Sequence, residues 1–271
     1  MSAQTSYSLV NAIGRAGMIA DGAIMQDVIS TAAEGTVALG CAVLKGTNPR
    51  QGAPVAAVAL DVDSVLASGG ASAATAQTIT SASFNGAIGA GRIVPAQQVT
   101  LTLNSHADWD ATVATVRGED CDGNVLVEDV LIPNGGNATI TTIGAFGRVT
   151  SLYIPAQTGT NGTYTVGTAP TKAEFSRRDI LGLSVWQSAH EPYTSDSYVD
   201  NDEMPVLRKG RCYVVVEDAV VNGDSVYVRI VTSGADAPGQ LGGEPSASFA
   251  LLRDASYRST AAIDGVAVVE L

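Results

Sequence analysis

Histidine chemistry in this chain would have to use one of only two residues, His106 or His190. His106 is followed closely by Asp108, Trp109 and Asp110, which offer a base and a carboxylate that could orient it. No GxSxG elbow or other recognised nucleophile motif accompanies this group. The HADWD segment also follows an expected strand, as a surface turn would. We therefore expect no catalytic residues and a protein that is not an enzyme.

Two loops gather oxygen ligands of the kind that calcium prefers. They contain Glu119, Asp120, Asp122 and Asn124 in one case, and Asp196, Asp200, Asp202 and Glu203 in the other. Neither loop matches the spacing D-x-[DN]-x-[DN]-G, and acidic residues are common in turns because they hydrogen-bond to nearby backbone. The GTNPRQG segment at 46–52 lacks the GK[ST] ending of a phosphate-binding loop. We expect solvated turns, no metal site and no cofactor.

Cysteine usage and charge exclude further classes. Cys41, Cys121 and Cys212 are widely spaced, odd in number and never arranged as CxxC, so we expect three buried small hydrophobic side chains. The formal charge of −12 opposes attraction to nucleic acid or to anionic membranes, so neither is an expected partner. Residues 1–18 have no early basic cluster followed by an apolar run, which favours synthesis and assembly in the cytosol.

The elements that would position any functional residues are strands. Aromatic residues make up only 5% of the chain, while Val, Ala, Thr and Gly recur, which predicts a mainly β fold. Residues 207–230 predict two strands, and in the second Val226, Val228 and Ile230 share one face. The closing run 266–271 is almost continuously apolar, so we expect it to pair with another strand of the domain that contains both ends of the chain, called the outer domain.

The domain organisation follows from a break in composition at 68–83, which lacks charge and large apolar side chains. Residues 35–63 have the short strands and tight turns of a barrel or sandwich. Beyond the break, strands expected at 125–132, 138–143 and 149–155 predict an antiparallel β-sandwich of about 100 residues. The simplest arrangement is an extended N-terminal arm, a discontinuous outer domain and an inserted sandwich; two consecutive domains are the alternative. The expected bounds are 1–30 for the arm, 31–70 plus 173–271 for the outer domain, and 71–172 for the insertion.

Three stretches carry a resemblance to a known family. AEGTVALGCAVLKGT at 33–47, the strands at 207–230 and GVAVVEL at 265–271 together resemble the structural cement, or head decoration, proteins of tailed bacteriophages. Residues 99–166, with ADWDAT and IPNGGNATI, resemble a small β module of phage virion proteins.

This resemblance implies a small β-barrel or β-tulip-like outer domain that binds the outer surface of a capsid. Such a protein would bridge coat subunits and stabilise the shell without catalysis. The implied partners are the major capsid protein and further copies of the chain, as a homotrimer. The implied location is the outer surface of the virion, after synthesis in the cytoplasm of a bacterial host.

The candidate contact residues lie in the arm and on the insertion. The arm mixes single apolar residues with glycines and has more apolar character than a disordered terminus usually has, which favours a partner surface. Its candidate capsid contacts are Ile19, Asp21, Ile24 and Met25. The main alternative function is a carbohydrate-binding or adhesin-like module, in which Trp109 and Tyr153 of the sandwich would be stacking surfaces.

Overall fold

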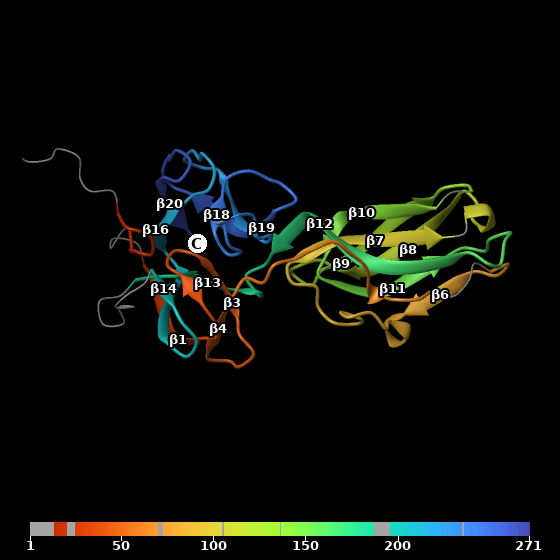
Figure 1. Cartoon of the computed structure of the whole chain (residues 1–271), viewed down its shortest axis with the longest axis horizontal. Helices are drawn as coiled ribbons and strands as arrows, with labels where there is room; N and C mark the ends of the chain where they lie inside the picture. The colour runs from red at the N-terminus through yellow and green to blue at the C-terminus, as the bar shows by residue number, and fades with distance from the viewer. Residues whose placement is uncertain are drawn as a thin grey trace, which may run out of the picture.

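The computed structural model describes residues 14–20, 25–69, 73–104, 106–135, 137–186, 196–234 and 236–271. Within these ranges the chain is built from strands, with two short 3-10 turns, η1 (Ser81–Ser83) and η2 (His106–Asp108). Nowhere in the described ranges is there a helix with the length and apolar character needed to cross a membrane. Figure 1 shows an elongated molecule with two lobes, which we call the outer lobe and the inserted lobe.

The outer lobe contains a closed barrel. Its strands, in order around the barrel, are β1 (Asp27–Ala33), β15 (Glu203–Lys209), β13 (Ile180–Ser184), β3 (Ala42–Lys45) and β4 (Gln51–Pro54). The barrel closes through a parallel pairing of β1 with β4, while its other neighbouring strands are antiparallel. Beside the barrel, the short strands β2 (Val37–Ala38) and β14 (Ser197–Tyr198) pair with each other.

One long strand, β12 (Thr163–Phe175), connects the two lobes (Figure 1). Its first part pairs with β7 (Ala96–Asn104) in the inserted lobe, and its last three residues pair in parallel with β19 (Phe249–Tyr257) in the outer lobe. The sheet continues to β10 (Ala138–Phe146) beyond β7, and to β17 (Ser225–Arg229) and β18 (Leu241–Gly242) beyond β19. Three more strands join it, namely β5 (Asp61–Leu66), β16 (Arg211–Val215) and β20 (Val266–Glu270).

The inserted lobe is a β-sandwich. Its second sheet has the order β6 (Gln77–Thr80), β11 (Arg148–Ile154), β8 (Thr112–Glu119) and β9 (Val125–Ile132), all antiparallel. This sheet packs against β7, β10 and the first part of β12. Leu101, Val116 and Leu152, which lie between the two layers, are at most 2% exposed.

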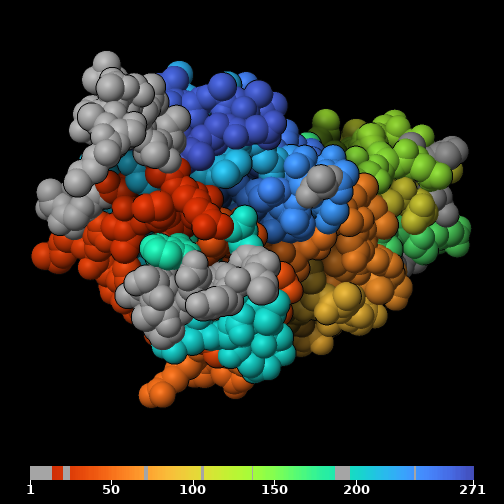
Figure 2. Space-filling model, turned by 60° about the vertical axis from the view of Figure 1, so that its left-hand side comes forward, coloured from red at the N-terminus to blue at the C-terminus, as the bar shows by residue number. Residues whose placement is uncertain are grey.

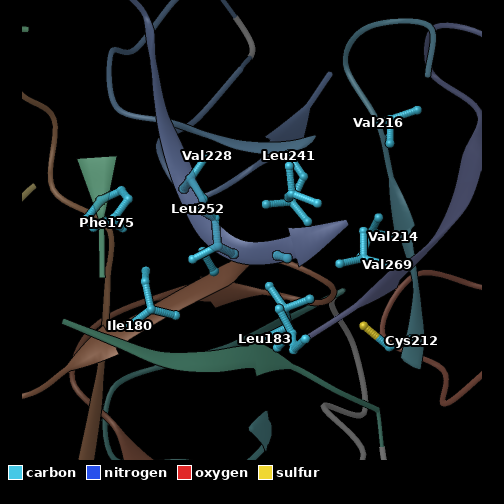
Figure 3. Close-up of a cluster of buried hydrophobic side chains, with 14 of the residues drawn as sticks. Phe175, Ile180, Leu183, Cys212, Val214, Val216, Val228, Leu241, Leu252 and Val269 are labelled. Carbon is cyan, nitrogen blue, oxygen red and sulfur yellow. The ribbon is translucent and has the colours of Figure 1, made fainter. Parts of the chain in front are cut away.

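Each lobe has its own hydrophobic core. The largest core of the outer lobe includes Phe175, Leu183 and Leu252 (Figure 3). Most of its other members are valines and alanines. All its members lie before residue 60 or after residue 172, whereas the buried core of the inserted lobe is drawn from Val65 to Val166. Small and β-branched side chains make up more than half of each core, as the low aromatic content predicted, and the inserted lobe also buries Trp109, Phe146 and Tyr164.

The structure confirms the expected fold class, a mainly β chain with a barrel and an inserted sandwich. It also confirms that the closing run pairs in the outer lobe, where β20 lies between β16 and β19. Two boundaries differ from the expected ones. Residues 27–30, expected in the arm, belong to barrel strand β1. Residues 61–66, expected in the outer domain, form β5, which pairs with β12 and places Val65 and Leu66 in the core of the inserted lobe.

Candidate capsid-binding surface

The described part of the N-terminal arm, residues 14–20, runs along β16 like an additional strand. The amide of Gly17 donates to the carbonyl of Tyr213 at 2.7 Å, and the amide of Tyr213 donates to the carbonyl of Met18 at 2.8 Å. Ile19 forms an antiparallel bridge with Cys212. The arm therefore shields an edge of β16 that would otherwise expose unpaired backbone groups.

Two glycines allow this close approach. A Cβ atom on Gly14 would lie 2.1 Å from the ring of Tyr213, a distance at which no side chain fits. Gly17 has a φ of +79°, which favours glycine, and its carbonyl accepts a hydrogen bond from the amide of Trp186 at 2.8 Å. These glycines of the arm therefore permit close approach to the chain's own outer lobe.

The arm and its neighbours form a partly apolar surface, which we call the arm-side surface and define by Arg15, Met18, Ile19, Met25 and Val215. Met25 is 80% exposed, and Met18, Ile19 and Val215 are between 38% and 44% exposed. Figure 2 shows the arm, in red, on the end of the outer lobe that is remote from the inserted lobe. Ile19 pairs with Cys212, so its side chain lies on the face of the β16 edge opposite to that of Val215, and the exposed apolar side chains surround this edge. Exposed apolar side chains around one edge can contribute to a protein contact.

Two of the four candidate contacts from the sequence lie on this surface, namely Ile19 and Met25. The other two, Asp21 and Ile24, lie outside the described residues. Sequence reasoning did not select Arg15 or Val215. Val215 stands in a continuous run of valines, and it is exposed because its side chain lies on the face of β16 opposite to the buried Val214.

A cavity of about 410 Å³ lies next to the arm-side surface and is lined by Arg15, Cys41, Asp196 and Asp264 among others. Arg15 forms an ion pair with Asp196, which connects the arm to the segment that leads into β14. Burial, with a smaller effect from the carboxylate of Glu217, raises the pKa of the Cys41 thiol to about 12. A thiol with this pKa is protonated at neutral pH and is a poor nucleophile, so the cavity has no activated cysteine.

The acidic loops hold backbone and neighbouring side chains in place. The carboxylate of Asp120 accepts hydrogen bonds from the amides of Asp122 and Asn124, both at 2.9 Å, which closes the first loop. In the second loop, Asp200 accepts from the amide of Gly35 at 3.0 Å and Asp202 from that of Val199 at 2.9 Å. Their oxygens therefore serve the turns, and within the described ranges no three His, Cys, Asp or Glu side chains are grouped as metal ligands.

The two aromatic candidates of the inserted lobe have different positions. Trp109 is 1% exposed, its indole N–H donates to the carbonyl of Asn104 at 2.8 Å, and its ring packs edge-on against Tyr164. The expectation that Trp109 is a surface for stacking was wrong, because this hydrogen bond allows the indole to be buried in the core. Tyr153 is 39% exposed on β11, where its neighbours across the sheet are Thr78 and Thr115.

The expectation for the cysteines was correct in part. Cys121 and Cys212 are buried and Cys41 is partly exposed, and all three are free thiols. Burial raises the pKa of Cys121 and of Cys212 to about 12.

A model of the family described as "Structural cement protein (E217 gp24/Pam3 gp6)" matches residues 122–271, more than half of the chain. This chain belongs to the structural cement protein family. The match includes two of the three stretches that carried the resemblance, 207–230 and 265–271, and it confirms that resemblance. No curated protein matches the chain. Membership identifies the cement protein as a structural component of a phage virion associated with its capsid, and it points to a role without catalysis.

Proposed function

We propose that this cement protein binds the outer surface of a phage capsid and stabilises the shell by bridging neighbouring coat subunits. Its family is the observation that carries the proposal. A protein that binds only the assembled arrangement of subunits stabilises that arrangement by mass action, because its binding free energy is lost when the subunits separate. We further propose that it assembles on the capsid as a homotrimer, a closed symmetry that suits a threefold position of the shell.

The arm-side surface supports a specific mode of binding. It lies at the end of the outer lobe remote from the inserted lobe, so a capsid contacted there leaves the inserted lobe projecting outward (Figures 1 and 2). Met18 and Met25 are well suited to such a contact because methionine side chains adapt to irregular apolar surfaces. Ile19, Asp21, Ile24 and Met25 remain our proposed capsid contacts.

Paired substitutions on the two lobes test this mode. A double variant with Ile19→Glu and Met25→Glu replaces two exposed apolar side chains by carboxylates. Because a carboxylate is costly to bury in an apolar contact, we expect this variant to bind purified capsids at least about tenfold more weakly. The matched control is Val125→Glu with Ile143→Glu in the inserted lobe, where the native side chains are 84% and 78% exposed. The control should bind like the unmodified protein.

Thermal unfolding of both variants reports whether either change disturbs the fold. Equal loss of binding in both variants, or no loss in the first, would contradict the proposed orientation. Sedimentation of the free protein and of protein released from capsids tests the trimer. A monomer in both cases would contradict it.

The carbohydrate-binding alternative is supported by one residue. With Trp109 in the core, Tyr153 is the remaining candidate for stacking on a sugar ring. Thr78 and Thr115, its neighbours across the sheet, could supply hydroxyl groups to a glycan. We keep this as a second candidate function for the inserted lobe alone.

A further inference from the structure

A second cavity of the outer lobe gathers cationic side chains. Its volume is about 380 Å³, and we call it the basic pocket. It is lined by Lys45 at the end of β3, by Arg208 and Lys209 at the end of β15, and by Arg177, which follows β12. Four of the chain's 15 basic residues thus meet at one place, although they come from three distant parts of the sequence.

Among the side chains that line the basic pocket, together with Leu271, four are cations and one is a carboxylate. Asp27 is its one acidic lining residue, and its carboxylate lies 3.6 Å from the guanidinium of Arg208. Arg177 donates to two backbone carbonyls, those of Arg208 at 3.0 Å and Asp254 at 3.3 Å, which carry no net charge. In the described part of the chain neither Lys45 nor Lys209 forms an ion pair. The pocket is therefore a cationic site on a protein whose formal charge is −12.

The basic pocket is continuous with the arm-side surface. Met25, the most exposed apolar side chain of that surface, is two residues before Asp27, which lines the pocket and pairs with Lys209 in the barrel. Gln26, between them, packs against Gly210, where an added Cβ atom would lie 2.9 Å from Gln26 Cγ. Met25 is thus two residues from a residue that lines the pocket, and we expect one partner to contact both.

We infer that the basic pocket binds carboxylate side chains of an acidic segment of the coat protein. This inference rests on the proposed function and adds the chemistry of the partner. Arginine and lysine bind carboxylates by charge-assisted hydrogen bonds, and a cavity of this size accepts one or two side chains. An extended polyanion such as nucleic acid would be repelled by the acidic remainder of the surface. A second copy of the chain is the other occupant that the test separates, because it would change self-association measured without capsids.

The test compares two variants with the same change in charge. The pocket variant carries Lys45→Glu and Lys209→Glu, which reverse the charge of the two cations without an ion pair in the described residues. It keeps Arg177, which donates hydrogen bonds to backbone carbonyls. The control is Arg117→Glu with Arg148→Glu, two exposed positions on the inserted lobe. Binding of each intact protein to purified capsids is measured over a range of salt concentrations, together with its thermal unfolding.

We expect the pocket variant to bind capsids about tenfold or more weakly at low salt, with a smaller salt dependence, and the control to bind like the unmodified protein. Equal binding by the two variants overturns the inference and leaves the proposed function intact, provided that the unmodified protein binds. Failure of the unmodified protein to bind overturns both. Loss of self-association in the pocket variant alone, measured by sedimentation without capsids, assigns the pocket to a second copy and also overturns the inference. The inference is also overturned if the unmodified protein binds single-stranded DNA and the pocket variant does not.

Discussion

Removal of the inserted lobe should leave a folded outer lobe, provided that the cut is placed where the two cores separate. We predict this for a chain in which residues 60–171 are replaced by a short Gly/Ser linker. No member of the outer-lobe core around Phe175 and Leu183 lies in this range, so that core loses no side chain. Strand β5 is removed with the inserted lobe because it pairs with β12 there.

The expected change in stability is small because its contributions nearly cancel. The outer lobe loses the pairing of Ala173 and Glu174 with β7, about 2 kcal/mol for two hydrogen bonds. It also loses two ion pairs. In Arg253 with Asp122 the side chains are 34% and 41% exposed, and in Arg92 with Asp179 they are 45% and 5% exposed, although Asp179 keeps its hydrogen bond from the hydroxyl of Ser176 at 3.0 Å. Such pairs contribute roughly 0–1 kcal/mol each. The shorter loop recovers roughly 2 kcal/mol of closure entropy. The net loss of about 0–2 kcal/mol is well below the ~5–15 kcal/mol stability of a typical domain.

Thermal unfolding followed by circular dichroism measures this change. We expect one cooperative transition with a Tm within about 10 °C of the corresponding transition in the full chain. A control with residues 71–171 replaced retains β5 without its partner and exposes Val65 and Leu66, so it should be less soluble at a similar Tm. A non-cooperative or insoluble product from the 60–171 replacement would refute the reasoning, because the lobes would then share one folding unit.

Three further predictions concern individual side chains. The pKa of about 12 that burial gives Cys121 and Cys212 keeps these two buried thiols neutral at pH 8, so a thiol reagent should react with them far more slowly in the native protein than in the unfolded chain, and the partly exposed Cys41 should react first; rapid native labelling of Cys121 or Cys212 would be inconsistent with it. Hydrogen bonds from Arg211 and Arg258 lower the pKa of Glu270 below its ordinary value of 4.5, so its carboxylate stabilises the fold above that pH and loses this effect as the pH falls through the lowered pKa. Glu270→Gln should therefore lower Tm at pH 7, and the difference should shrink in acid; a constant difference would contradict the assignment. If the inserted lobe binds glycans, Tyr153→Ala should abolish binding on a glycan array without changing Tm, and an array with no binding by the unmodified protein would remove that candidate function.

Most strands were predictable from the sequence because their signals are local. The run at 125–132 alternates in burial over most of its length and forms β9 with the expected bounds. The strands expected at 138–143 and 149–155 are present as β10 and β11, with ends displaced by a few residues. Turn residues and short apolar runs specify such strands without reference to the rest of the fold.

The candidate site was only partly predictable. Ile19 and Met25 are exposed, and their role as capsid contacts stays a prediction. Trp109 was misplaced because its surroundings in sequence are polar, while its burial depends on the carbonyl of Asn104 and the ring of Tyr164. The two strands at 207–230 were expected, but β16 pairs with β20 and β17 pairs with β18 and β19, so neither pairs with the other.

The sequence by itself determined the β class, the positions of most strands and the family, because these depend on composition, on two-residue periodicity and on stretches of contiguous residues. Only the tertiary structure decided which strands are neighbours. The barrel closes through a parallel contact between β1 and β4, and β12 extends from one lobe into the other. The basic pocket was also decided by the tertiary structure. Strands that pair over long sequence separations bring Lys45, Arg177 and Lys209 together at their ends. The free energy that selects these pairings comes from burying the cores and satisfying backbone groups across the whole fold, which no short segment contains.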